Sequence, residues 1–165
     1  KLAGDGEETV SMVVASRHIM FECGNYVIVS RLLEGEFFNY KNAIPAESST
    51  KARVNLKLIV DSVERTSLLI TSKIKSPIRC VFDENMIRIS STTSLGAAND
   101  RIPAAIDGKR VEIGFNNRYI LDALKASKKD ELIFKFSGPL APCKIIPKEG
   151  DDFTYLVLPV RFKND

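Results

Sequence analysis

Two stretches with helical periodicity, each set between short strand-like segments, constrain the fold of this 165-residue chain most strongly. Apolar side chains recur at helical spacing over residues 54–69 and again over residues 119–127, with charged side chains between them. This spacing places the apolar side chains on one face of a helix, so we predict a helix in each stretch. Asn116 or Asn117 is suited to cap the second helix at its N-terminal end. Each helix is then expected to bury one stripe and to present the other to solvent or to a partner.

Runs of alternating apolar and polar residues predict strands before, between and after the two helices. Tight-turn signals such as Gly24-Asn25 and Asp107-Gly108 join neighbouring runs as hairpins. The order indicates an α+β fold of mostly antiparallel sheet, with the helices gathered on one face. The first and last groups of strands share a pattern, which suggests a repeated module. The expected strands cover residues 9–15, 18–23, 26–31, 78–82, 86–90, 97–105, 110–115, 131–136, 143–146 and 155–160.

The composition excludes several classes of protein. An apolar share of 44% and a charged share of 27% argue against collagen, a disordered tail or a disulfide miniprotein. Lys and Arg number 24 against 21 Asp and Glu, a formal charge of +3, without the one-sign excess of a histone-like or membrane-coating protein. No apolar run approaches the roughly 18 residues of a membrane-spanning helix, so no membrane partner is expected. The chain begins at Lys1 without a signal peptide, and we expect a fragment of a longer protein.

The sequence offers little material for catalysis or metal binding. His18 is the only histidine, and it lies in a strand-like run where a structural role is expected rather than that of a general base. Cys23, Cys80 and Cys143 are widely spaced in apolar segments, which favours buried thiols in a reducing compartment over a zinc site. We therefore expect no catalytic residue, no metal and no cofactor.

Two alternatives to a binding module stay open on the residues alone. In the first, the chain is a small α+β enzyme whose carboxylates act on a substrate in a cleft, although its paired acidic residues fall at expected hairpin turns. In the second, it is a general nucleic-acid-binding domain, which needs exposed aromatic side chains for base stacking. Carboxyl groups with raised pKa values gathered in one pocket would favour the enzyme. A bare apolar groove under the C-terminal strand would favour the binding module.

The C-terminal segment, residues 155–162, is apolar almost throughout. A strand buried on both faces accounts for such a run. Pro159, however, cannot donate a hydrogen bond to a central ladder, which places this segment at a sheet edge or outside the sheet. Exposed apolar residues beside Arg161 would then form a pocket for a hydrophobic peptide.

Three blocks of sequence occur in a characteristic order and spacing. They are GNYVIVSRLLEGEFFNYKNAIP at residues 24–45, VEIGFNNRYILDALKA at residues 111–126 and FTYLVLPVR at residues 153–161. Together they resemble the bacterial sliding clamps, the beta subunits of DNA polymerase III, over nearly the whole chain. The resemblance implies a DNA-clamp fold, with residues 1–40 as the end of a middle domain and residues 41–165 as a complete third domain. It also implies a non-catalytic, cytoplasmic processivity factor for DNA replication, whose full-length chains pair as a ring around duplex DNA without reading its sequence.

The resemblance further implies a pocket for partner proteins between the middle and third domains. In the family, the DNA polymerase III alpha subunit, clamp loaders and repair proteins insert a short motif into it, roughly Gln-Leu-x-Leu-Phe. Leu158, Pro159 and Val160 would take the apolar side chains of this motif, while Asn116 and Arg161 would meet its polar atoms. The matching positions are Phe38, Asn42, Ala43, Asn116, Tyr119, Leu140, Pro142, Leu156, Val157, Leu158, Pro159, Val160, Arg161 and Phe162. The first three of these, in the linker, differ from common members, which implies a rim of different shape.

The resemblance also assigns surfaces for the ring and for DNA. Leu68 and Leu69, at the end of the first helix, match the apolar contact with the first domain of the other chain. Basic residues on the two helices would line the hole and face DNA phosphates. A diffuse positive lining is expected rather than base contacts, because specific readout would halt sliding. The candidate lining residues are Lys57, Arg65, Arg118, Lys125 and Lys129.

Overall fold

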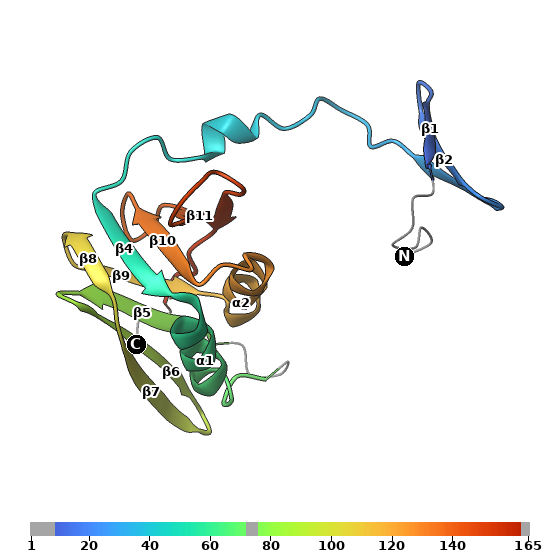
Figure 1. The fold of residues 1–165 in the computed structure, drawn as a ribbon. Helices are drawn as coiled ribbons and strands as arrows, with labels where there is room; N and C mark the ends of the chain where they lie inside the picture. The colour runs from blue at the N-terminus through green and yellow to red at the C-terminus, as the bar shows by residue number, and fades with distance from the viewer. Residues whose placement is uncertain (1–8, 72–75, 163–165) are drawn as a thin grey trace. The chain divides into compact units, whose positions relative to one another are not determined.

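The N-terminal part of the chain forms a small sheet of its own. The computed structural model describes residues 9–71 and 76–162, and the chain divides into two compact units, Lys1–Asn39 and Tyr40–Asp165 (Figure 1). Lys1, the first residue of the chain, therefore lies outside the described residues. The first unit contains the three expected strands, paired in order as an antiparallel meander. They are β1 (Ser11–Val14), β2 (His18–Cys23) and β3 (Tyr26–Arg31).

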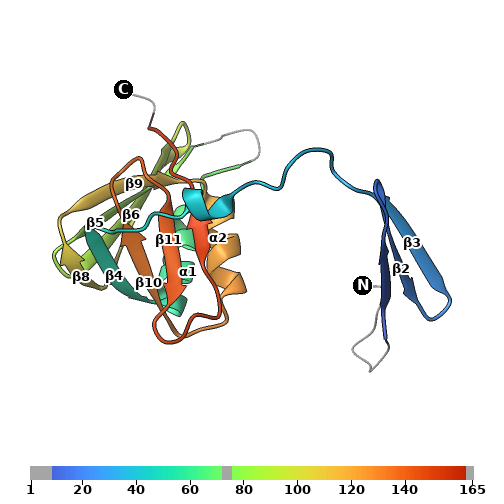
Figure 2. The ribbon, with the colours of Figure 1, turned by 90° about the horizontal axis from the view of Figure 1, so that it is seen from above.

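The second unit packs helices α1 (Leu56–Thr66) and α2 (Asn117–Ala126) against antiparallel sheets (Figures 1 and 2). The two helices contact each other, α1 also contacts β4, β6 and β7, and α2 contacts β12. One sheet has the strand order β12-β11-β10-β4-β8 and the other has the order β7-β6-β5-β9. This arrangement confirms the α+β class. The strands are β4 (Thr50–Asn55), β5 (Ile78–Asp83), β6 (Met86–Thr93), β7 (Gly96–Pro103), β8 (Ala105–Gly108), β9 (Val111–Phe115), β10 (Glu131–Phe136), β11 (Cys143–Pro147) and β12 (Tyr155–Val157), with a short 3-10 turn η1 (Tyr40–Ala43) before them.

The prediction of a helix beginning at residue 54 is wrong at its N-terminal end. Residues 50–55 form strand β4, in which Thr50, Ala52 and Val54 are buried and the residues between them are exposed. This strand lies between β10 and β8, so its period-two pattern is fixed by pairing on both sides. Asn55 ends the strand and caps α1, because its side-chain oxygen accepts a hydrogen bond of 3.1 Å from the N–H of Leu58.

Two other expected strands also end differently. The run predicted at residues 97–105 is divided at Ala104 into β7 and β8, which belong to different sheets. The last strand stops at Val157 rather than at residue 160. Pro159 lies two residues after this end, outside the ladder to which it cannot donate an N–H.

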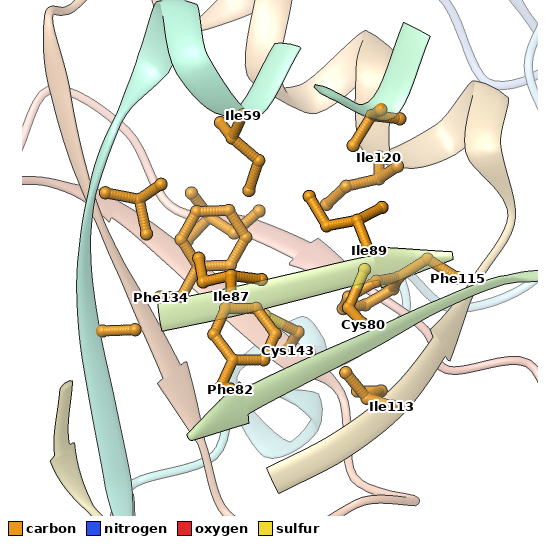
Figure 3. Packing of buried hydrophobic residues seen from close by; sticks show 14 of the residues in the cluster. Ile59, Cys80, Phe82, Ile87, Ile89, Ile113, Phe115, Ile120, Phe134 and Cys143 are labelled. Carbon is orange, nitrogen blue, oxygen red and sulfur yellow. The ribbon is translucent and has the colours of Figure 1, made fainter. Parts of the chain in front are cut away.

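The core of the second unit lies between the helices and the sheets. Figure 3 shows Ile59 of α1 and Ile120 of α2 pointing toward side chains from the strands. The ring of Phe82 lies 4.5 Å from that of Phe136 and 5.9 Å from that of Phe134, measured between ring centroids. All five of these side chains are 2% exposed or less, so they belong to the fully buried part of the core.

The thiols of Cys80 and Cys143 belong to this core (Figure 3). Burial raises the pKa of Cys80 to about 12 and raises the pKa of Cys143 well above its ordinary value. Because the thiolate is the reactive form, both side chains stay protonated and inert at neutral pH. The expectation of buried, reduced cysteines is met at these positions.

We therefore predict that iodoacetamide leaves Cys80 and Cys143 unmodified in the folded chain at pH 8 and modifies both after unfolding in guanidinium. Mass spectrometry of tryptic peptides measures the modified fraction at each cysteine. Substantial labelling of Cys80 or Cys143 under native conditions would contradict the burial of these thiols.

Candidate peptide-binding groove

An open groove of about 520 Å³ lies at the N-terminal end of α2. One wall is the first turn of that helix, and another is the C-terminal segment at Val160. The remaining wall comes from the residues that follow α1 and precede β5. Its described lining residues are Ile70, Thr71, Ser76, Pro77, Asn116, Asn117, Arg118, Tyr119 and Val160.

The start of α2 is held in place by its cap. Phe115 ends β9 inside the core, and the next residue, Asn116, accepts hydrogen bonds from the N–H groups of Arg118 (3.0 Å) and Tyr119 (3.3 Å). These bonds use the carbonyl oxygen of the Asn116 amide and leave its amino group to donate elsewhere. Tyr119 is 63% exposed beside the groove. An aromatic side chain on a rigid helix start is a suitable anchor point for a ligand.

The C-terminal segment passes from one sheet to the other. It pairs with β11 as far as Val157, and then its Val160 N–H donates a hydrogen bond of 2.8 Å to the carbonyl oxygen of Gly114 in β9. Leu158 is 69% exposed and Val160 is 37% exposed. The expectation that Pro159 marks a departure from the ladder is confirmed, and the departure leaves apolar side chains in contact with solvent.

The structure brings only part of the expected pocket together. Asn116, Tyr119 and Val160 line the groove, whereas the other expected wall residues are not among its described lining residues. Val157 is 4% exposed and belongs to the core, so it offers a ligand little surface within this unit. Phe38 lies in the first unit and is exposed. The remaining positions are exposed or partly buried: Asn42 and Ala43 in η1, Leu140 and Pro142 in the β10–β11 loop, Leu156 in β12, and Leu158, Pro159, Arg161 and Phe162 in the C-terminal segment.

Several lining residues were not predicted from the sequence. Ile70 and Thr71 follow the end of α1, while Ser76 and Pro77 precede β5. The sequence signal for them is weak, since Ile70 continues the helical apolar spacing and Pro77 only marks a loop. Their convergence on α2 depends on tertiary packing.

Most of the expected DNA-facing cations are paired with carboxylates. Such pairing reduces the positive potential of the helices and agrees with the small formal charge of the chain. Among the described residues, Arg118 has no carboxylate partner and is exposed. The pairs are Lys57–Asp61 and Lys125–Glu64 at 2.6 Å, Arg65–Asp100 at 2.5 Å, and Lys129–Asp152.

Among the carboxyl groups in residues 9–71 and 76–162, two have shifted pKa values, and both are held in their charged form. Partial burial raises the pKa of Asp100, but hydrogen bonds from the Arg65 guanidinium and the Arg101 N–H outweigh it and leave that pKa below its ordinary value. The hydrogen bond from Lys148, at 2.6 Å, lowers the pKa of Glu131. A general acid needs the opposite shift, so these groups give no support to the enzyme alternative.

The turn after α1 carries the expected ring-contact residues, because the helix predicted to reach residue 69 ends at Thr66. Leu68 is 79% exposed, and Leu69 is partly buried, with its Cδ1 near the start of β7 at Gly96. Leu95, in the turn before β7, is 65% exposed. These leucines form an apolar surface beside the edge strand of the four-stranded sheet.

The groove suits binding rather than chemistry. Its described lining combines apolar and aromatic side chains with amides, hydroxyls and one guanidinium. Within residues 9–71 and 76–162 there is no cluster of His, Cys, Asp and Glu that is able to hold a metal ion. The described helices are also too short or too polar to cross a membrane.

Two helices packed on antiparallel sheets, with an open groove beside the last segment, define a domain of the DNA-clamp class. The chain belongs to the DNA polymerase III beta subunit family: residues 41–161 match its C-terminal domain. This confirms the resemblance drawn from the sequence blocks.

Known proteins similar to this chain are sliding clamps. The beta sliding clamps of Staphylococcus epidermidis and Staphylococcus aureus are each 31% identical over 163 residues, which is 98% of this chain and 43% of theirs. The DNA polymerase sliding clamp of Bacillus subtilis has a TM-score of 0.87 at 30% identity, covering 97% of this chain and 43% of that one. A putative DNA polymerase III beta subunit of Eubacterium rectale has a TM-score of 0.86 at 35% identity, covering 94% of this chain and 42% of that one. The chain thus spans less than half the length of these relatives.

Proposed function

We propose that this chain is the C-terminal part of a sliding clamp, a non-catalytic processivity factor that encircles duplex DNA in the cytoplasm and tethers the replicative polymerase. Membership of the family supports this function, and so does the fold of the second unit. The observation that carries the binding role is the groove at Tyr119 and Val160. In the same proposal, residues 1–40 end the middle clamp domain and residues 41–165 form the third.

The groove is proposed to receive the short motif of clamp-binding proteins, including the polymerase III alpha subunit, the clamp loader and repair proteins. Tyr119 and Val160 offer apolar contacts, while the amino group of Asn116 offers hydrogen-bond donors. The exposed guanidinium of Arg161, next to Val160, is proposed to offer others. Leu140, Pro142, Leu156 and Leu158 are proposed to extend this surface beyond the groove. A related clamp from Bartonella birtlesii, with a TM-score of 0.85 at 27% identity, has been solved bound to griselimycin, so a member of this family has a ligand site.

A labelled peptide containing Gln-Leu-x-Leu-Phe tests this proposal. We expect saturable binding to the chain by fluorescence anisotropy, with competition by unlabelled peptide. A matched peptide with Asp in place of the three apolar motif residues should not compete, because it cannot bury its side chains at Tyr119 and Val160. Equal competition by the two peptides would contradict the proposed recognition.

The ring and DNA surfaces are proposed from the same family membership. Leu68 and Leu69 would contact the other chain of a homodimeric ring, and the helices would face the DNA. Since most helix cations are already paired, the electrostatic attraction of this chain for DNA is expected to be weak. A ring retains DNA by topology, so weak attraction is compatible with the function.

We predict that the chain binds duplex DNA weakly and loses affinity steeply with salt. Between 50 and 200 mM salt the dissociation constant should rise by about 3- to 40-fold, the range for about one to three phosphate contacts. Replacing Arg118 by Ala should lower the salt slope by about one, whereas Arg88→Ala, on β6, should leave it unchanged. Fluorescence anisotropy across a salt series measures the slope, and salt-insensitive binding would contradict the proposed phosphate contacts.

A further inference from the structure

The last described residues of the chain lie on the outer face of the four-stranded sheet. In β9, Val111, Ile113 and Phe115 point into the core, so Gly114 faces the opposite side. Val160 donates its N–H to the Gly114 carbonyl oxygen at 2.8 Å. This hydrogen bond attaches the C-terminal segment to the sheet two residues before the cap of α2.

Gly114 is required here by space rather than by backbone conformation. A Cβ at this position would overlap the carbonyl oxygen of Val160 and would lie 3.0 and 3.1 Å from two atoms of the Phe162 ring. The colliding oxygen belongs to the backbone, so it cannot move aside by a side-chain rotation. Any larger residue at position 114 must therefore push the segment away from the sheet.

Arg79 holds the same segment from the neighbouring strand. It is the residue directly opposite Gly114 in the β5–β9 pairing, and its guanidinium carbon lies 4.5 Å from the centroid of the Phe162 ring. A salt bridge of 3.1 Å to Glu112 orients this guanidinium. The ring is thus held between a cation and a strand position that has no side chain.

We propose that Gly114 and Arg79 are positioning residues. They hold the C-terminal segment against the four-stranded sheet, in the position where Val160 forms the groove wall. Neither residue lines the groove. They act through Val160 and Phe162, and Phe162 serves as an anchor on the sheet rather than as a contact for the ligand. This inference rests on the proposed function of the groove as a peptide site.

The test compares Gly114→Ala with Arg79→Ala in the full chain. Hydrogen exchange followed by NMR reports the Val160 amide, and anisotropy reports binding of the Gln-Leu-x-Leu-Phe peptide. Gly114→Ala should speed exchange at Val160 and weaken peptide binding, each by at least about tenfold, with exchange at Ile113 unchanged. Arg79→Ala should shift both in the same direction by about 2- to 5-fold, the size of an exposed cation–π contact.

Arg88→Ala is the matched control, because Arg88 lies on the same face of the sheet and also forms a salt bridge, to Asp83 at 3.2 Å. It should leave both measurements unchanged. If Gly114→Ala does not fold, the same two measurements are made on Arg79→Ala and Phe162→Ala instead.

The outcomes separate the inference from the proposed function. Continued protection of Val160 in Gly114→Ala would overturn the anchor. Release of Val160 without loss of peptide binding would overturn the positioning role. If the unsubstituted chain binds no peptide, the proposed function fails, and hydrogen exchange still decides whether Gly114 and Arg79 hold the segment.

Discussion

Replacing Phe82 by Ala is expected to lower the free energy of unfolding of the second unit by about 3–5 kcal/mol. The side chain is fully buried and contacts the rings of Phe134 and Phe136 in the other sheet. Its removal leaves a cavity where the two sheets meet, and the surrounding strands relax only partly because each is fixed by ladder pairing. Urea denaturation followed by circular dichroism measures the change.

Met86→Ala, in the same hairpin, is the control for this substitution. Met86 is 39% exposed at the turn, so its truncation should cost much less than that of Phe82. Equal destabilisation by the two variants would show that Phe82 does not stabilise the packing of one sheet against the other.

Replacing Tyr119 by Ala is expected to weaken binding of the Gln-Leu-x-Leu-Phe peptide by about 30-fold or more, the effect of a loss of about 2 kcal/mol at an interface anchor. The ring stands on the first turn of α2, beside the groove and three residues after the Asn116 cap. Its removal takes away the aromatic wall without disturbing the buried stripe of Ile120 and Leu124. Isothermal titration calorimetry measures both affinity and enthalpy.

Tyr26→Ala is matched to this variant, because Tyr26 has a similar exposed fraction, 57% against 63% for Tyr119, and lies in the first unit. Its affinity for the peptide should equal that of the unsubstituted chain. Unchanged binding in Tyr119→Ala, or an equal loss in Tyr26→Ala, would contradict the assignment of the groove as the peptide site.

The fold class was predictable because the strongest local patterns agree with the tertiary structure. Ile59 and Val63 in one helix, and Ile120 and Leu124 in the other, recur at helical spacing and are the residues that each helix buries. Strand β4 was missed because its alternation is short and runs directly into the α1 pattern. Only its pairing with β10 and β8 distinguishes Thr50–Asn55 from the start of a helix.

The candidate site was predictable only in part, for a different reason. Asn116, Tyr119 and Val160 were identified through the family resemblance, and Pro159 explains physically why the last segment leaves its sheet. The wall formed by Ile70 and Ser76 depends on which loops pack together, which no local pattern encodes. Gly114 did carry a signal, because a glycine inside an alternating strand often marks close approach of another backbone.

The central claim is that the groove beside α2 is the site for the clamp-binding motif. Two-dimensional NMR of the chain, titrated with the Gln-Leu-x-Leu-Phe peptide, tests it most directly. We predict that the largest shift changes fall on the amides of Thr71, Arg118, Tyr119 and Val160, while amides of the first unit such as Val13 stay unchanged. Shift changes centred on another surface, or no change at saturating peptide, would contradict the claim.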